Sequence, residues 1–361
     1  MDRWFRAGAA LFAVVSALLV ARPAVAEDAV APPPPQGPLR DVVPPDVSPE
    51  ARAIYQKLLP GVAARRMNLR IPHTLAEFDA RDAANVAGST PGADATIKAL
   101  GAATAEFKLG GVGVFETRPP QFQDDGTVLI RVHGGGFIQG SAHSSAAMDA
   151  VMARALGRRI LSIDYTVAPR GKWNTVTDQV IAVYKAVLAQ GYEPRNIGMY
   201  GDSAGANIVP ASVLKLRDEG LPMPAAVVLL SPCIDFTRNS DTEMTLRDDD
   251  PVLWNQDDMV AGLGAYADPA DWKNPYVSPI FGDFTRGFPP VLLQVGTREI
   301  LLSDSVRFYQ AIKTAGGDAE LDVYEGMAHV FQSYMAGTPE QKQAFAEMAR
   351  FWSRYLIARK P

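Results

Sequence analysis

Short apolar segments alternate with amphipathic helical segments along residues 111–358. The apolar segments have the length of strands that are buried on both faces of a sheet. The predicted strands cover residues 113–116, 127–132, 159–164, 197–200, 226–230, 291–295 and 321–324. The predicted helices cover residues 145–156, 176–190, 204–217, 303–315 and 339–358. This order predicts an α/β fold with a mostly parallel central sheet flanked by helices. In such sheets, functional side chains gather on loops at the carboxyl ends of the strands.

Two stretches do not follow this alternation. Residues 49–105 are rich in alanine and have helical patches, and residues 235–285 form a long insertion between two predicted strands. An insertion of that length is either a lid over a site or a disordered loop. The insertion contains several large apolar and aromatic side chains, which favour an ordered lid. These side chains are Trp254, Met259, Tyr266, Trp272 and Tyr276.

The beginning of the chain has the pattern of a secretory signal peptide. Arg3 and Arg6 precede an apolar run at residues 7–20, and a small-residue cleavage site follows at residues 24–26. We therefore expect residues 1–26 to be removed on export to the periplasm or the extracellular space, with no stable membrane anchor afterwards. An uncleaved transmembrane anchor is the alternative. Residues 27–48 are a Pro-rich linker, and residues 49–361 form the folded domain.

Charge and cysteine content exclude two classes. The formal net charge is −5 and there is no block of basic residues, so nucleic acid is not expected as a partner. Cys233 is the single cysteine, which rules out a disulfide within this chain. We interpret Cys233 as a small core residue.

A G-x-S-x-G motif at residues 201–205 directly follows the predicted strand 197–200 and opens a helix. This strand–turn–helix context is typical of a nucleophilic serine, here Ser203. Such a turn requires glycine at positions 201 and 205, because side chains there would collide with the neighbouring strand and helix. The helix that begins near Ala204 adds partial positive charge beside a developing oxyanion. The alternative is a glycine-rich turn that only caps the helix.

Three glycines, Gly134, Gly135 and Gly136, follow the predicted strand 127–132. Their backbone N–H groups, together with that of Ala204, are expected to form an oxyanion hole. A phosphate-binding loop is the rival interpretation, but neither of the usual glycine patterns for phosphate is present. His133, at the start of this loop, is expected to anchor it by hydrogen bonds.

The general base should come last in chain order in this fold. Of the four histidines, at positions 73, 133, 143 and 329, only His329 follows Ser203, and it lies just after the last predicted strand. The carboxylate that orients it should lie after the strand 291–295, where Glu299 and Asp304 are the candidates. We favour Glu299 because it is nearer the strand end, whereas Asp304 falls in the first turn of the next helix.

Taken together, these motifs resemble the bacterial hormone-sensitive-lipase-like esterases, also called family IV. The matching segments are residues 133–137 (HGGGF), 164–169 (DYTVAP), 201–205 (GDSAG) and 326–329 (GMAH). The resemblance implies an α/β-hydrolase fold, carboxylesterase activity without a cofactor, and a cap built from about residues 49–105 and 235–285. The chain departs from the family's usual pattern in having Glu299 instead of an aspartate and Arg170 instead of a glutamate.

The expected reaction is hydrolysis of small, short-chain acyl esters through an acyl-enzyme on Ser203, with no metal. A lactone hydrolase or an amidase with the same triad is the alternative, and a non-catalytic ligand-binding homologue of the same fold is a more remote one. The expected partner is a small-molecule ester. A homodimer is left open.

Overall fold

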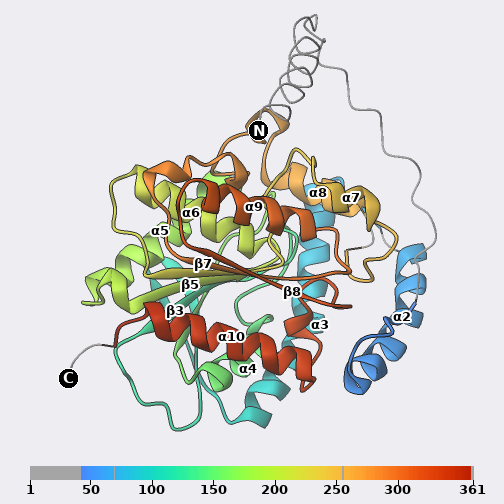
Figure 1. Cartoon of the computed structure of the whole chain (residues 1–361), viewed down its shortest axis with the longest axis horizontal. Helices are drawn as coiled ribbons and strands as arrows, with labels where there is room; N and C mark the ends of the chain where they lie inside the picture. The colour runs from blue at the N-terminus through green and yellow to red at the C-terminus, as the bar shows by residue number, and fades with distance from the viewer. Residues whose placement is uncertain (1–41, 69, 254–255, 359–361) are drawn as a thin grey trace, which may run out of the picture. The chain divides into compact units, whose positions relative to one another are not determined.

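The computed structural model describes residues 42–68, 70–253 and 256–358. Eight strands form one sheet in the order β1-β2-β4-β3-β5-β6-β7-β8 (Figure 1). β2 runs antiparallel to both of its neighbours, and the pairs from β4 to β8 are parallel. The mostly parallel sheet confirms the predicted α/β fold. The strands are β1 (Ala103–Leu109), β2 (Val112–Arg118), β3 (Val128–Val132), β4 (Ile160–Asp164), β5 (Ile197–Asp202), β6 (Ala226–Leu230), β7 (Val291–Gly296) and β8 (Ala319–Tyr324).

Every residue of the central strands β3, β5, β6 and β7 is buried, as the continuous apolar runs predict. β1 is different because it lies at the edge of the sheet and most of its residues are exposed or half-exposed. No strand was predicted there, and residues 103–105 were assigned to the helical stretch 49–105. The structure corrects that boundary, since the helix ends at Leu100 and Gly101 caps it in the left-handed conformation, with φ of 65°.

Helices cover both faces of the sheet (Figure 1). One face carries α5 (Trp173–Ala189), α6 (Gly205–Asp218) and α9 (Leu302–Thr314), and the other carries α4 (Ala146–Leu156) and α10 (Pro339–Tyr355). Gly198 of β5 leaves room for the Trp352 ring of α10, because a Cβ at Gly198 would lie 2.6 Å from that ring. The second face is therefore packed directly against the middle of the sheet.

Further helices lie in the two stretches that depart from the alternation. α2 (Pro49–Asn68) and α3 (Leu75–Leu100) precede β1, and α7 (Asp241–Thr245) and α8 (Gln256–Tyr266) lie in the insertion. α3 begins at a capping box, in which the Thr74 and Glu77 side chains each accept from the other's backbone N–H. The short 3-10 turns are η1 (Pro194–Asn196), η2 (Pro269–Asp271), η3 (Pro279–Phe281), η4 (Phe284–Arg286) and η5 (Phe331–Ser333).

The aromatic side chains of the insertion serve to anchor it. Tyr266 is fully buried and stacks on Phe137, with ring centroids 4.4 Å apart, and Trp272 contacts Phe236 edge-on. These rings pack into the main hydrophobic core, which fixes the insertion on the body of the domain. Trp254, the predicted signal peptide at residues 1–26 and residues 27–41 of the predicted linker lie outside the described residues. Across the part of the chain that is described, no helix combines the length and the apolar character that crossing a bilayer requires.

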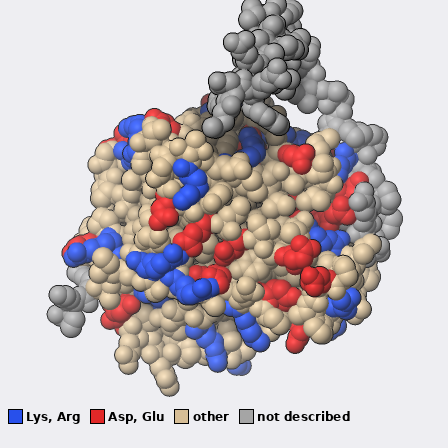
Figure 2. All heavy atoms as spheres, in the orientation of Figure 1, with Lys and Arg blue, Asp and Glu red and all other residues tan. Residues whose placement is uncertain are grey.

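Acidic and basic side chains are intermingled on the face shown in Figure 2, and neither sign covers that face. In the interior, buried charged side chains form a hydrogen-bonded network around Arg131. Arg131 of β3 is 2% exposed and donates to Asp149 of α4 (2.7 Å) and to Asp202 of β5 (2.8 Å). Tyr200 also donates to Asp149 (3.1 Å). This network ties two central strands and a helix together beneath the end of β5.

Replacing Arg131 by methionine would leave two buried carboxylates without their cation. We expect Arg131→Met to lower the free energy of unfolding by about 3–5 kcal/mol, the usual result of removing one partner from a buried ion pair. The control is Arg195→Met, whose ion pair with Glu193 is more than half exposed on both sides, so no measurable change is expected. Urea unfolding of both variants tests this, and equal stabilities would contradict it.

Candidate active site

Ser203 lies in a tight turn between β5 and α6. Its φ of 54° is in the left-handed region, which costs roughly 1–3 kcal/mol for a residue with a side chain. The glycines on either side explain why the turn closes: a Cβ at Gly205 would lie 2.0 Å from the Val132 carbonyl oxygen, and one at Gly201 would lie 2.4 Å from Gly205. The turn therefore rests on the end of β3 and holds the Ser203 side chain above the sheet edge.

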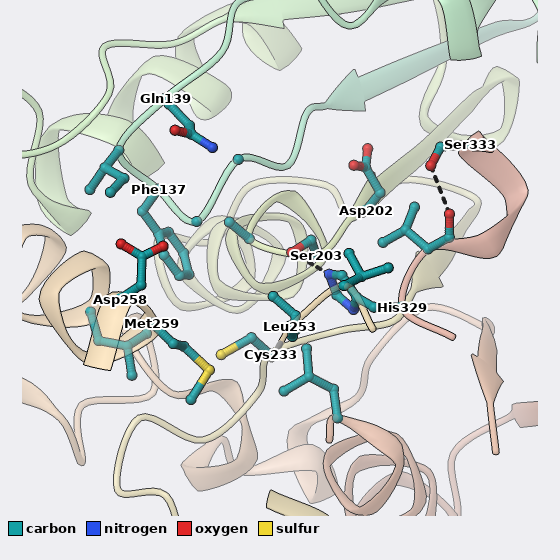
Figure 3. A pocket seen from close by; sticks show the side chains of 18 of the residues that line it. Phe137, Gln139, Asp202, Ser203, Cys233, Leu253, Asp258, Met259, His329 and Ser333 are labelled. Atoms are coloured by element: carbon teal, nitrogen blue, oxygen red, sulfur yellow. Dashed lines mark hydrogen bonds between the residues drawn. The ribbon is translucent and has the colours of Figure 1, made fainter. Parts of the chain in front are cut away.

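His329 lies in the loop after β8, and its Nε2 is 2.8 Å from Ser203 Oγ (Figure 3). The other histidines lie elsewhere. His133 is fully buried, donates from Nδ1 to the Gly134 carbonyl (2.8 Å) and stacks on Tyr165. Burial lowers the pKa of His133 to about 4, so it stays neutral and anchors the glycine loop. His143 pairs with Asp94 on the surface, and His73 precedes α3 and is exposed.

Glu299 is the carboxylate that reaches the histidine. Its Oε2 is 3.1 Å from His329 Nδ1, and the Glu299 side chain is fully buried. Asp304 is in the first turn of α9, where its carboxylate accepts from the backbone N–H groups of Ile234 and Asp235 instead. Of the two predicted candidates, the structure places Glu299 beside His329 and uses Asp304 to dock the insertion.

Ser231, which the sequence reasoning did not single out, connects the acid to the base. Its hydroxyl donates to Glu299 Oε1 (3.0 Å) and accepts from the Val330 N–H (3.0 Å). The Gly296 N–H also donates to Glu299 Oε1 (2.6 Å). These contacts fix the carboxylate and the histidine loop relative to each other. Its position in the sequence could have indicated this role, because Ser231 directly follows β6 at the edge of the sheet where the other loops of the site begin.

The glycine loop lies beside Ser203, and the structure corrects one of its predicted roles. The Gly134 N–H donates to Asp202 Oδ2 (3.2 Å), so it is committed to the turn before Ser203 and is not an oxyanion donor. Gly135, Gly136 and Ala204 line the same cavity as Ser203. Gly135 has φ of 115°, and a Cβ there would lie 2.0 Å from the Gln139 carbonyl, so this position requires glycine.

The cavity above Ser203 has a volume of about 680 Å³. Its walls are largely apolar and include Phe137, Leu253 and Met259 (Figure 3). Leu263 also lines the cavity. No group of three or more side chains suited to binding a metal ion occurs within residues 42–68, 70–253 and 256–358. The arrangement suits an uncharged small molecule whose reacting atom lies near Ser203 Oγ.

Both additional stretches contact the glycine loop. Arg81 of α3 donates to the Gln139 side chain (3.0 Å) and forms a bidentate ion pair with Asp258 of α8 at the cavity wall. α8 itself approaches the loop closely, since a Cβ at Gly262 would lie 2.6 Å from the Gly136 carbonyl oxygen. α2 contributes differently: the Tyr55 hydroxyl donates to the Gly326 carbonyl (2.7 Å) and so supports the loop that carries His329.

Comparison with known proteins agrees with this geometry. A family model described as the alpha/beta hydrolase fold matches residues 129–333. An esterase of Acinetobacter venetianus is 36% identical over 225 residues, which span 62% of this chain and 74% of that protein. An acetyl-hydrolase of Streptomyces hygroscopicus is 31% identical over 280 residues, or 78% of this chain and 88% of that protein. The solved structure of an esterase from the bacterial hormone-sensitive lipase family matches with a TM-score of 0.74 and 31% identity, over 86% of this chain and 99% of that chain.

The fold and the site define an α/β hydrolase in which a serine, a histidine and a carboxylate meet at the carboxyl edge of a parallel sheet. Within that class, the chain belongs to the bacterial hormone-sensitive-lipase-like esterases, family IV, which are carboxylic ester hydrolases. The family expected from the motifs is confirmed.

The contact between α8 and the glycine loop predicts an effect of a single methyl group. Gly262→Ala would push α8 and the Gly136 backbone apart, because the new Cβ needs space that the carbonyl occupies. We expect kcat for ester hydrolysis to fall by about tenfold to a hundredfold, the effect of a misplacement of about 1 Å near reacting atoms.

Gly264→Ala is the matched control for this variant. Gly264 is in the same helix, is exposed and has nothing within 4 Å of an added Cβ. Steady-state kinetics should show wild-type kcat for Gly264→Ala. Equal kcat values for the two variants would show that α8 does not position the loop.

Proposed function

We propose that the protein is a serine carboxylesterase that hydrolyses short-chain acyl esters through an acyl-enzyme on Ser203. The observation that carries the proposal is the chain of contacts from Ser203 Oγ to His329 Nε2 (2.8 Å) and from His329 Nδ1 to Glu299 Oε2 (3.1 Å). Nucleophile, base and orienting carboxylate are thus within reach of one another, and a cavity opens above the nucleophile.

In the acylation half, Ser203 Oγ attacks the ester carbonyl carbon while His329 Nε2 takes the hydroxyl proton. The negative charge that develops on the carbonyl oxygen is stabilised by the N–H groups of Gly135, Gly136 and Ala204 and by the amino end of α6. The imidazolium then gives its proton to the leaving alcohol, and the C–O bond of the ester breaks. Glu299 holds the histidine tautomer and stabilises the imidazolium without taking the proton.

Deacylation repeats these steps with water as the nucleophile. His329 accepts a proton from water, and the hydroxide attacks the acyl carbon to form a second tetrahedral intermediate. His329 then returns the proton to Ser203 Oγ as the acid departs. The neutral His133 takes no part in these proton transfers, because its Nδ1 hydrogen is held by the Gly134 carbonyl.

Two observations support a small acyl group. A relative with 31% identity is named an acetyl-hydrolase, and Arg81, Asp258 and α8 bound the cavity on the side of the glycine loop. Residues 1–26 carry the separate proposal of export, which rests on their sequence pattern alone.

The catalytic roles can be tested at Ser203 and His329. We expect Ser203→Ala and His329→Gln to lower kcat for p-nitrophenyl acetate by roughly 10⁴-fold or more, since members of a triad act as a unit. Ser203→Ala should also abolish labelling by a fluorophosphonate probe. His143→Gln is the control, because His143 pairs with Asp94 on the surface, and it should keep wild-type kcat. Labelling that persists in Ser203→Ala would place the nucleophile elsewhere.

The substrate class can be tested with a panel of p-nitrophenyl esters from acetate to palmitate, with a lactone and an anilide included. We expect kcat/KM to be highest for acyl chains of about two to six carbons, since residues of the insertion and Arg81 of α3 form walls of the cavity. Activity that rises steadily towards palmitate would contradict the short-chain proposal. A higher kcat/KM on the lactone or the anilide would favour a lactone hydrolase or an amidase.

A further inference from the structure

A buried carboxylate that the mechanism above does not use lies next to the triad. Asp250 is in the insertion between α7 and α8 and is fully buried. Its Oδ1 accepts from the backbone N–H groups of Val252 (2.8 Å) and Leu253 (2.9 Å), which places it at the start of a tight turn. Val252 and Leu253 both line the cavity above Ser203.

The other oxygen of Asp250 reaches across to the loop that carries the acid. Asp250 Oδ2 accepts from the Ile300 N–H (3.2 Å), and Ile300 directly follows Glu299. One side chain therefore holds a cavity wall on one side and the Glu299 turn on the other. Desolvation opposes the charge of a buried carboxylate, and the three N–H groups that donate to Asp250 offset part of that cost.

The charge of Asp250 interacts with the triad itself. Burial raises the pKa of Asp250 to about 6, and the negative charge of Glu299 raises it too, while the charge of His329 lowers it. The negative charge of Asp250 and the positive charge that His329 carries as an imidazolium therefore attract each other. The imidazolium arises in each proton transfer of the proposed reaction.

The remaining ionisable groups around Asp250 come from three other parts of the chain. Tyr334 follows η5 and Tyr55 is in α2, and burial raises the pKa of both phenols, so they stay neutral. Arg298 lies over the Tyr55 ring. Arg247, Asp248 and Asp249 precede Asp250 on its own segment and have contacts of their own.

We propose that Asp250 is a positioning residue for the hydrolytic reaction: it anchors the Glu299 turn to the insertion and supplies a second negative charge that stabilises the His329 imidazolium. The inference rests on the proposed function, since it assigns Asp250 a part in the charge balance of the Ser203–His329–Glu299 triad. Asp250 acts through the triad and does not touch the reacting atoms.

The proposal fixes the direction of a pH effect. Above pH 6 Asp250 is ionised and helps to stabilise the imidazolium, and below that pH it gains a proton and this help is lost. Asp250→Asn removes this charge at every pH.

The test compares Asp250→Asn with Asp304→Asn. Asp304 is also buried, has its pKa raised to about 6 by burial, and docks the insertion through backbone N–H groups. Besides burial, the groups that shift the pKa of Asp304 most are its hydrogen-bond partners Ser240 and Ile234 and the nearby charge of Asp235. Both variants lose a buried anion and an acceptor, so both are expected to unfold at a lower temperature. They differ because only Asp250→Asn removes a charge that interacts with His329.

For Asp250→Asn we expect kcat at pH 8 to fall about tenfold and the acid limb of kcat/KM to move about one pH unit lower. The two values correspond, because a tenfold loss of imidazolium stabilisation equals one unit of pKa. Asp304→Asn should keep the position of the wild-type limb. The measurement is kcat/KM for p-nitrophenyl acetate from pH 4.5 to 9, with folding checked by circular dichroism at each pH.

Two results would overturn the proposal: an unshifted limb in Asp250→Asn, or an equal shift in Asp304→Asn. If Asp250→Asn does not fold, Asp250→Glu decides instead: it keeps the charge, so a limb displaced by about one pH unit in Asp250→Glu would overturn the proposal. None of them bears on Ser203: if the wild-type protein hydrolysed no ester, the proposed function would fail first and separately.

Discussion

The contact between Gly205 and the end of β3 determines where the site is built. A side chain at Gly205 would collide with the Val132 carbonyl oxygen, so the backbone of the Ser203 turn rests directly on the strand that leads into the glycine loop. The parallel pairing of β3 and β5, with Val132 opposite Gly201, brings both loops to the same edge of the sheet. Ser203 and the N–H groups of the glycine loop are therefore placed by the sheet register, and the strained φ of Ser203 is held by packing on both sides.

The two stretches outside the alternating pattern, residues 49–105 and 235–285, form part of the site itself. α3 and α8 meet at the Arg81–Asp258 pair and both contact the glycine loop, while α2 supports the His329 loop through Tyr55. A small displacement of one of these helices would shift the backbone around Ser203 and His329, because closely packed contacts transmit strain. The cavity thus combines a rigid floor from the sheet with walls whose position depends on helix docking.

The sequence could predict what is local. Ser203 and His329 were identifiable because each follows a buried strand within a recognisable motif, and β6 was predicted with its observed bounds. β1 was missed because an edge strand has no continuous apolar run. Side chains that act by long-range contacts were missed as well: Ser231, Asp250 and Arg81 meet partners 50 or more residues away, and their neighbours in the sequence do not show this. The Gly134 assignment changed for the same reason, since its partner is Asp202.

Charge is distributed unequally on the two sides of Ser203, and this asymmetry suits the proposed reaction. Asp202 precedes Ser203 and would place a negative charge near the proposed oxyanion, but Arg131, which it shares with Asp149, partly offsets that charge from within the sheet. On the histidine side, Glu299 accepts hydrogen bonds from a hydroxyl and a backbone N–H, which hold its carboxylate in place without cancelling a negative charge. Negative charge is therefore kept where the proposed imidazolium would form and is partly offset where the proposed oxyanion would form. A buried site can sustain this separation because its dipoles are fixed before the substrate arrives.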